Sequence, residues 1–142
     1  MRTFVTFEAD FPNDEVLGSD QSLEKPPGRN IAASLRNILS LQAMHTSDVA
    51  SHEFYGWTFD VKCPRSSVQL LLQFPGPWLL CFLQRKRITG MFCSSASLES
   101  DFFFVIGEAA KALQGDMRFS DLRWYFKKDY ESGQIGIFSR MP

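Results

Sequence analysis

Three consecutive apolar segments, separated by short proline-containing turns, constrain the fold of this chain more than any other feature of its sequence. Residues 53–62 alternate between two faces, and a period of two is typical of a half-buried strand. One face carries Tyr55, Trp57, Phe59 and Val61, and the other carries Gly56, Thr58, Asp60 and Lys62. Further strands are predicted over residues 68–74 and 78–84. Because such short turns join only antiparallel neighbours, the sequence predicts an antiparallel meander.

Two helical patterns flank the meander. The first begins at Arg29 and ends near residues 45–48, and the second follows the possible N-caps Ser94, Ser95 and Ser97 and stops at Gly115. Strands are also predicted over residues 3–9, 122–130 and 134–139, with a turn at 131–133, whereas residues 88–97 fit either a short strand or an irregular crossover. The order β-α-β-β-β-α-β-β predicts an α+β fold: an antiparallel sheet of five to six strands with two helices packed on one face. The other face is expected to be polar and open to solvent, through Thr58, Asp60, Gln69 and Gln73.

The chain is expected to form one domain over residues 1–142. This length is close to the most common domain size, and 44% hydrophobic and 22% charged residues are near globular averages. The one linker-like stretch is an acidic loop at about residues 10–28, which contains three prolines and two glycines. We expect this loop to be mobile, and its length suggests a functional role.

The sequence excludes several classes of function. No apolar run is long enough to span a bilayer, and Glu8 comes too early for a signal peptide, so we expect a cytoplasmic protein without a membrane partner. Phosphate-binding motifs, a nucleophile elbow and zinc spacings among the cysteines are all missing. We therefore predict no cofactor, no metal and no enzymatic activity, and interpret His45 and His52 as surface histidines.

Charge is distributed unevenly along the chain. Between Thr3 and Glu24 there are six acidic residues and no basic one, whereas between Val61 and Leu98 there are five basic residues and no acidic one. Both segments could be solvated faces. Alternatively, the acidic segment steers a basic protein partner. The run at residues 85–87 is basic, but no aromatic residues are interleaved with it on an exposed face. The run is therefore weak evidence, and we do not expect a nucleic-acid partner.

Four stretches of the sequence resemble a pattern in small, single-domain bacterial proteins. They are Gly28-Arg29-x-x-Ala32-x-x-Leu35, Tyr55-Gly56-Trp57-x-Phe59-x-Val61, Pro77-Trp78-Leu79-Leu80 and Asp116-x-Arg118-x-x-Asp121-Leu122-Arg123-Trp124-Tyr125. Some proteins with this pattern resemble the immunity proteins of polymorphic and contact-dependent toxin systems. The resemblance implies a non-catalytic protein that binds and neutralises a cognate toxin, and it supplies no catalytic residue.

The leading hypothesis is therefore an immunity-type protein-binding module. If its toxin is a nuclease with a basic cleft, the carboxylates of Glu8, Asp10, Asp14 and Glu15 could stand in for phosphates. One alternative is a structural or regulatory homodimer joined through Phe104 or through residues 134–139. Another is a small-molecule-binding module with a pocket near Trp57, Trp78 and Trp124.

Overall fold

The predicted meander is the centre of the sheet. The computed structural model describes residues 1–53, 56–74, 76–86 and 94–138; the predictions made for Tyr55, for residues 87–93 and for Ser139 lie outside the described residues. Strands β6 (Gly56–Lys62), β7 (Ser66–Gln73) and β8 (Trp78–Lys86) pair antiparallel along their whole lengths. Trp57, Phe59 and Val61 are buried as the alternation predicts.

The sheet extends on both sides of the meander, through strands distant in sequence beyond β8 and through short strands nearby in sequence beyond β6. The described residues form an eight-stranded main sheet, in which β1 (Phe4–Ala9) lies between β8 and β9 (Phe119–Tyr125). The short strand β10 (Ile137–Phe138) pairs with β9 at one edge. At the other edge, β4 (His45–Thr46) and β5 (Ala50–His52) both pair with β6. The α+β class is confirmed, with more strands than the five or six predicted.

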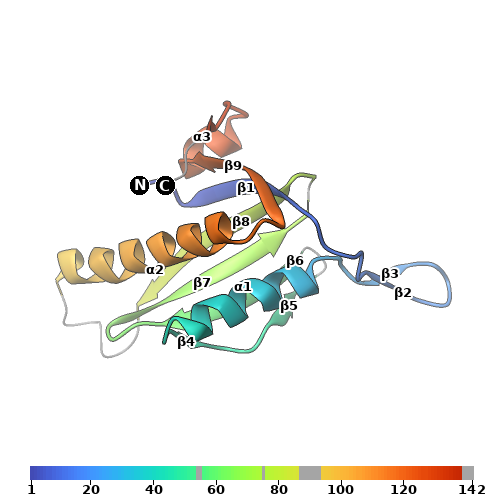
Figure 1. The fold of residues 1–142 in the computed structure, drawn as a ribbon, viewed down its shortest axis with the longest axis horizontal. Coiled ribbons are helices and arrows are strands. Elements are labelled where there is room, and N and C mark those ends of the chain that lie inside the picture. The colour runs from blue at the N-terminus through green and yellow to red at the C-terminus, as the bar shows by residue number, and fades with distance from the viewer. Residues whose placement is uncertain (54–55, 75, 87–93, 139–142) are drawn as a thin grey trace.

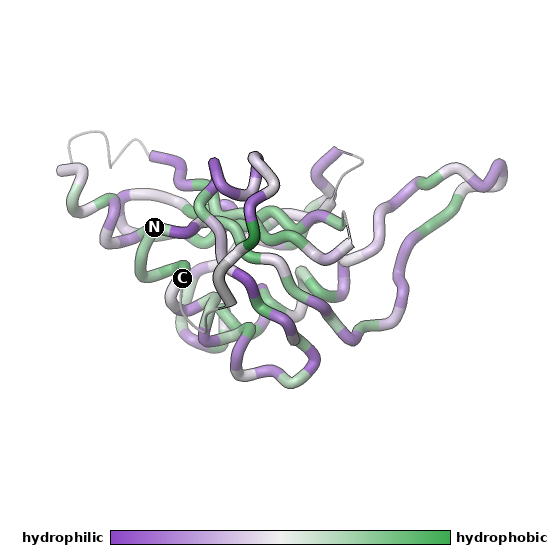
Figure 2. The backbone as a smooth tube through the Cα atoms, turned by 90° about the horizontal axis from the view of Figure 1, so that it is seen from above, coloured by the Kyte–Doolittle hydropathy of each residue, from purple (hydrophilic) through white to green (hydrophobic). Residues whose placement is uncertain are grey.

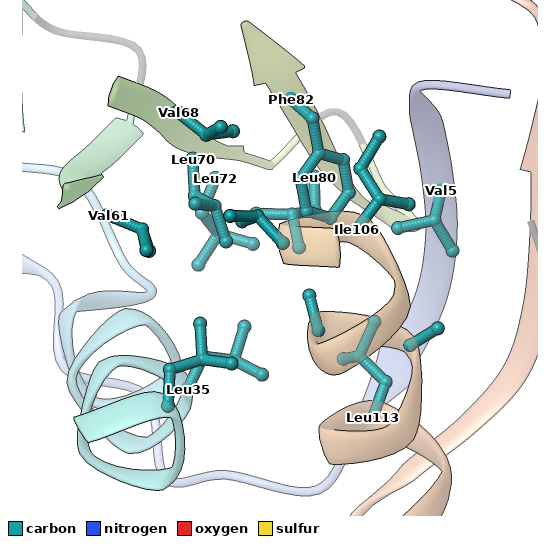
Figure 3. Packing of buried hydrophobic residues seen from close by; sticks show 14 of the residues in the cluster. Val5, Leu35, Val61, Val68, Leu70, Leu72, Leu80, Phe82, Ile106 and Leu113 are labelled. Atoms are coloured by element: carbon teal, nitrogen blue, oxygen red, sulfur yellow. The ribbon is translucent and has the colours of Figure 1, made fainter. Parts of the chain in front are cut away.

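Two long helices cover one face of the sheet, as Figure 1 shows. They are α1 (Arg29–Leu41) and α2 (Ser95–Gly115), and the Ser94 side chain accepts a hydrogen bond from the Ser97 amide at the start of α2. Figure 3 shows apolar side chains from β1, the meander and both helices meeting in the layer between them. The labelled residues are Val5, Leu35, Val61, Val68, Leu70, Leu72, Leu80, Phe82, Ile106 and Leu113.

The opposite face of the sheet differs from the prediction. A second apolar cluster lies there, formed by Phe4, Leu71, Leu79 and Cys81. A short helix, α3 (Lys127–Glu131), places Tyr130 against it with ring centroids 5.5 Å from Phe4. The predicted strand over residues 122–130 is therefore β9 followed by α3, because the chain turns at Phe126 to cover this cluster. Of the polar positions expected to face solvent, Gln69 is buried.

Residues 10–28, called the acidic arm below, contain an ordered hairpin where a mobile loop is predicted. Strands β2 (Val16–Leu17) and β3 (Leu23–Lys25) pair antiparallel and form a second sheet of their own. Figures 1 and 2 show this hairpin projecting away from the body of the protein. The arm leaves the end of β1 and returns to the start of α1, so both of its ends are fixed to the core.

Candidate functional site

Hydrogen bonds between its own polar groups define the structure at the tip of the acidic arm. The Gly18 amide donates to the Ser22 carbonyl at 2.8 Å, which closes the turn. The Asp20 carboxylate accepts from the Ser22 hydroxyl at 2.6 Å and from the Ser22 amide at 3.0 Å. These hydrogen bonds hold the pKa of Asp20 below its ordinary value, since they favour the charged form. The tip therefore presents a carboxylate in a fixed position.

The hairpin exposes apolar side chains as well as acids. Val16, Leu17 and Leu23 are 41%, 53% and 41% exposed. A two-stranded hairpin has no core in which to bury them, and an isolated hairpin is marginal in water. Clustered exposed apolar side chains rimmed by polar groups are typical of protein interaction sites. Sequence reasoning missed these residues because each strand is too short to show a period.

The four acidic residues predicted to bind a partner occupy two different settings. Glu8 and Asp10 are exposed, at and just beyond the end of β1, and the Asp10 amide donates to the Arg118 carbonyl at 2.8 Å. Asp14 and Glu15 lie further along the arm and line one cavity together. Glu15 is oriented by Asn13, whose side-chain amide donates to Glu15 Oε1 at 3.1 Å. The structure thus brings Asp14 and Glu15 together and leaves the other two on the β1 side.

Asp14 has a role inside the chain. Its Oδ1 accepts from the Gly28 amide and its Oδ2 from the Asn30 amide, both at 2.7 Å. The N-terminus of a helix leaves such amides without partners, and Gly28 has no side chain with which to cap α1. Asp14 therefore caps α1 from a distance and fastens the arm to the body. The anion bound at the N-terminus of α1 is thus a carboxylate of the same chain.

A cavity of about 220 Å³ lies at the base of the acidic arm. Its wall includes three aromatic side chains, Phe11, Phe74 and Trp78, and its acidic part is formed by Asp14 and Glu15. The Phe74 and Trp78 rings lie 4.6 Å apart between centroids at a 45° tilt, and Phe74 is 55% exposed. The cavity is therefore open to solvent and combines aromatic faces with carboxylates.

The basic residues of the meander lie at the end opposite the acidic arm. The arm packs against the turn that joins β7 to β8, where Phe74 and Trp78 lie. Ser67 pairs with both Lys62 and Arg85, and Ser66 pairs with Lys86, at the far ends of these strands. The uneven charge along the sequence therefore becomes a separation of charge in space, with the acidic arm at one end of the molecule (Figure 1).

Other candidate groups serve the fold or stand apart from the acidic arm. The Trp57 indole donates to the Pro26 carbonyl at 3.0 Å, and Trp124 is buried in the core, so of the three tryptophans only Trp78 lines the cavity. A larger recess of about 550 Å³ lies beside α1 and β4 and includes His45 and Arg36. The Arg36 guanidinium there already donates to the Ser47 carbonyl at 3.1 Å.

The surfaces named for a homodimer are exposed to different degrees. Phe104 is 59% exposed on α2, and its neighbour Phe103 is 46% exposed. The predicted last strand is reduced to Ile137–Phe138 within the described residues. A strand of this length offers a partner few backbone groups with which to pair.

Comparison with protein families, with curated proteins and with solved structures found no match to this chain. Within the described residues, no helix has the length and apolar character that crossing a membrane requires. In the same part of the chain, no group of three or more His, Cys, Asp or Glu side chains is arranged to hold a metal ion. The acidic arm and the cavity at its base are therefore the candidate functional site on geometry alone.

Proposed function

We propose that this chain is a non-catalytic protein-binding module that holds a basic partner protein with its acidic arm. The observation that carries the proposal is the projecting hairpin, which combines the fixed Asp20 carboxylate with three exposed apolar side chains. Carboxylates on a projecting element steer a basic surface toward the protein, and apolar side chains then bury area in the contact.

The apolar side chains of the hairpin cannot supply a stable complex alone. Fully burying one aliphatic side chain is worth about 1.5–3 kcal/mol, and Val16, Leu17 and Leu23 are each about half exposed, so burying them yields roughly 2–4 kcal/mol. Micromolar affinity needs about 8 kcal/mol. We therefore include the acidic residues and the cavity at the base of the arm in the proposed contact.

In the specific form that the sequence resemblance implies, the partner is a toxin and the chain is an immunity-type inhibitor. A nuclease toxin binds phosphates with a basic cleft, and an arm bearing carboxylates has the charge to occupy such a cleft. Glu8, Asp10 and Glu15 are the residues we expect to face it, while Asp14 remains bound to α1.

We expect the toxin to be the C-terminal domain of the protein encoded directly upstream, and the test uses that domain in a catalytically inactive form. Its association rate with this chain is measured by surface plasmon resonance at several salt concentrations. The variant Glu8→Gln, Asp10→Asn, Glu15→Gln should associate at least about tenfold more slowly at low salt, with a weaker salt dependence. Asp14 is left unchanged so that α1 keeps its cap.

A matched control removes three exposed carboxylates elsewhere, as Asp48→Asn, Glu99→Gln, Glu131→Gln. It has the same net charge as the arm variant, so a general effect of charge would slow both equally. Equal association rates for the two variants, or no association of the wild-type chain with that domain, would contradict the proposal.

A further inference from the structure

The cavity at the base of the acidic arm has the size of one side chain. Sites for small-molecule ligands usually enclose about 300–1,000 Å³. At about 220 Å³, this cavity is too small for most such ligands and large enough for one long side chain. Residues 12–15 of the acidic arm line the cavity, so a partner held by the hairpin would lie close to it.

The aromatic wall of the cavity packs against the backbone at its base. A Cβ atom on Gly28 would lie 2.6 Å from Trp78, so the indole packs directly on the backbone at this glycine. Gly28 has φ +103°, a conformation that other residues rarely adopt, so the close approach depends on glycine. Trp78 in turn supports the Phe74 ring at 4.6 Å. The cavity thus presents aromatic faces in fixed positions, and such faces attract cations.

The acidic part of the cavity is also held in place. Both oxygens of Asp14 accept backbone amides of the α1 N-terminus, and each keeps a lone pair for a further donor. Glu15 accepts from Asn13 through Oε1, which leaves Oε2 available to a donor from outside. None of the described residues that line the cavity is basic. The α1 N-terminus compensates the charge of Asp14, whereas Glu15 has no basic partner among the described lining residues.

Arginine is the side chain that this combination fits best. A guanidinium group is planar, weakly hydrated and able to stack on an aromatic ring while it donates to a carboxylate, whereas an ammonium group is compact and strongly hydrated. The chain itself uses the same contact nearby, since Arg118 lies 4.4 Å above the Phe11 ring and donates to Asp116 at 2.6 Å.

We propose that the cavity formed by Phe11, Asp14, Glu15, Phe74 and Trp78 binds one arginine side chain of the basic partner protein. The guanidinium stacks on the Phe74–Trp78 pair and donates to Glu15 at the rim. The arginine is thereby the anchor of the interface, and the hairpin covers the surface around it. This inference rests on the proposed function, because it names the group on the partner that the acidic arm brings into place.

The cavity can be tested without any partner. The peptide acetyl-Gly-Arg-Gly-amide is titrated into the protein, and ring resonances of Phe74 and Trp78 are followed by NMR. Matched peptides carry lysine or citrulline, the uncharged isostere of arginine. We expect saturable shifts with a Kd on the order of 10 mM for arginine, at least about threefold weaker binding for lysine, and none for citrulline. Shifts that are equal for citrulline and arginine, or missing with arginine, overturn the proposal.

The same cavity is tested in the complex with the variant Phe74→Ala. Phe74 is 55% exposed, so its removal leaves the core intact, and Phe104→Ala on α2 is the control for losing an exposed ring. If the cavity anchors the complex, Phe74→Ala raises the dissociation rate at least about tenfold and Phe104→Ala leaves it unchanged.

The outcomes separate the two proposals. Slower association of the arm variant together with unchanged dissociation of Phe74→Ala retains the proposed function and overturns the arginine cavity. If the NMR shifts are specific for the arginine peptide but the arm variant associates as fast as the wild type, the cavity remains an arginine site and the proposed function is overturned.

Discussion

The cap that Asp14 provides to α1 leads to a quantitative prediction for Asp14→Ala. The substitution removes two hydrogen bonds of 2.7 Å to the Gly28 and Asn30 amides. Replacing a capping side chain by alanine costs about 1 kcal/mol, and loss of the negative charge from the helix N-terminus costs about 0.3–1 kcal/mol more. Gly28 is buried, so its amide is left without an acceptor, which adds about 1 kcal/mol.

Allowing for partial replacement by water, we expect Asp14→Ala to lower the free energy of unfolding by about 2 kcal/mol. Asp14→Asn keeps one acceptor oxygen and loses the charge, so it should cost about half as much. The assay is urea unfolding followed by tryptophan fluorescence. With a slope of roughly 2 kcal/mol per molar urea, the midpoint of Asp14→Ala should fall by about 1 M.

The matched control is Asp10→Ala, which removes an exposed carboxylate of the same arm and should change the midpoint by less than about 0.25 M. Hydrogen exchange adds a local measurement, since the Gly28 and Asn30 amides should exchange faster in Asp14→Ala. Equal midpoints for Asp14→Ala and Asp10→Ala would refute the reasoning, because they would mean that the carboxylate contributes nothing as a cap.

Three further predictions concern parts of the fold outside the arm. Gly56→Ala would place a Cβ against a backbone carbonyl of β7 and should lower the free energy of unfolding by about 3 kcal/mol. Gly107 has open space around it in α2, so Gly107→Ala should raise the free energy of unfolding by about 0.5–1 kcal/mol. Urea midpoints measure both changes. Hydrogen bonds from Arg118 hold the pKa of Asp116 below its ordinary value of 3.8, so this pair stabilises the fold above that pH, and the contribution is lost as the pH falls through the lower folded value. Midpoints measured at a series of acidic pH values should therefore fall less steeply for Asp116→Asn than for the wild type. Burial raises the pKa of Cys81 to about 12, so iodoacetamide at about pH 8 should label Cys81 in unfolded protein and leave it unmodified in native protein, as peptide mapping by mass spectrometry would show.

Local signals in the sequence predicted the parts of the fold that depend on neighbouring residues. The alternation around Trp57 and Phe59 identified β6, and its turns identified the rest of the meander. One of the three possible caps, Ser94, is the N-cap of α2, and the helix ends at Gly115 as predicted. Each of these features is determined by residues within one helical turn or one hairpin, which is the range over which a sequence pattern is informative.

Features that depend on distant residues were not predictable in the same way. The place of β1 between β8 and β9 is set by pairs such as Val5 with Leu80 and with Trp124. Asp14 can cap α1 only because the arm folds back and brings it to Gly28, which lies 14 residues further along the chain. Chain spacing alone carries no signal for such contacts.

The candidate site was predicted in part. The acidic composition of residues 10–28 indicated the arm, but the cavity depends on Phe74, which is the last residue of the strand predicted over residues 68–74. An aromatic residue at the end of an apolar strand, directly before a turn, was the available signal. It became interpretable only when the fold brought Phe74 beside Glu15.

The interior position of β1 also determines when this chain can fold as it is synthesised. Ala9 ends β1 and Trp78 begins its first partner, so 69 residues (78 minus 9) separate them. At about 5–20 residues per second, translation leaves β1 without a partner for roughly 3–14 s. An apolar segment such as Phe4–Phe7 invites aggregation during that interval. Glu8 and Asp10, directly after it, would then act as gatekeepers that keep nascent chains apart before any partner is met.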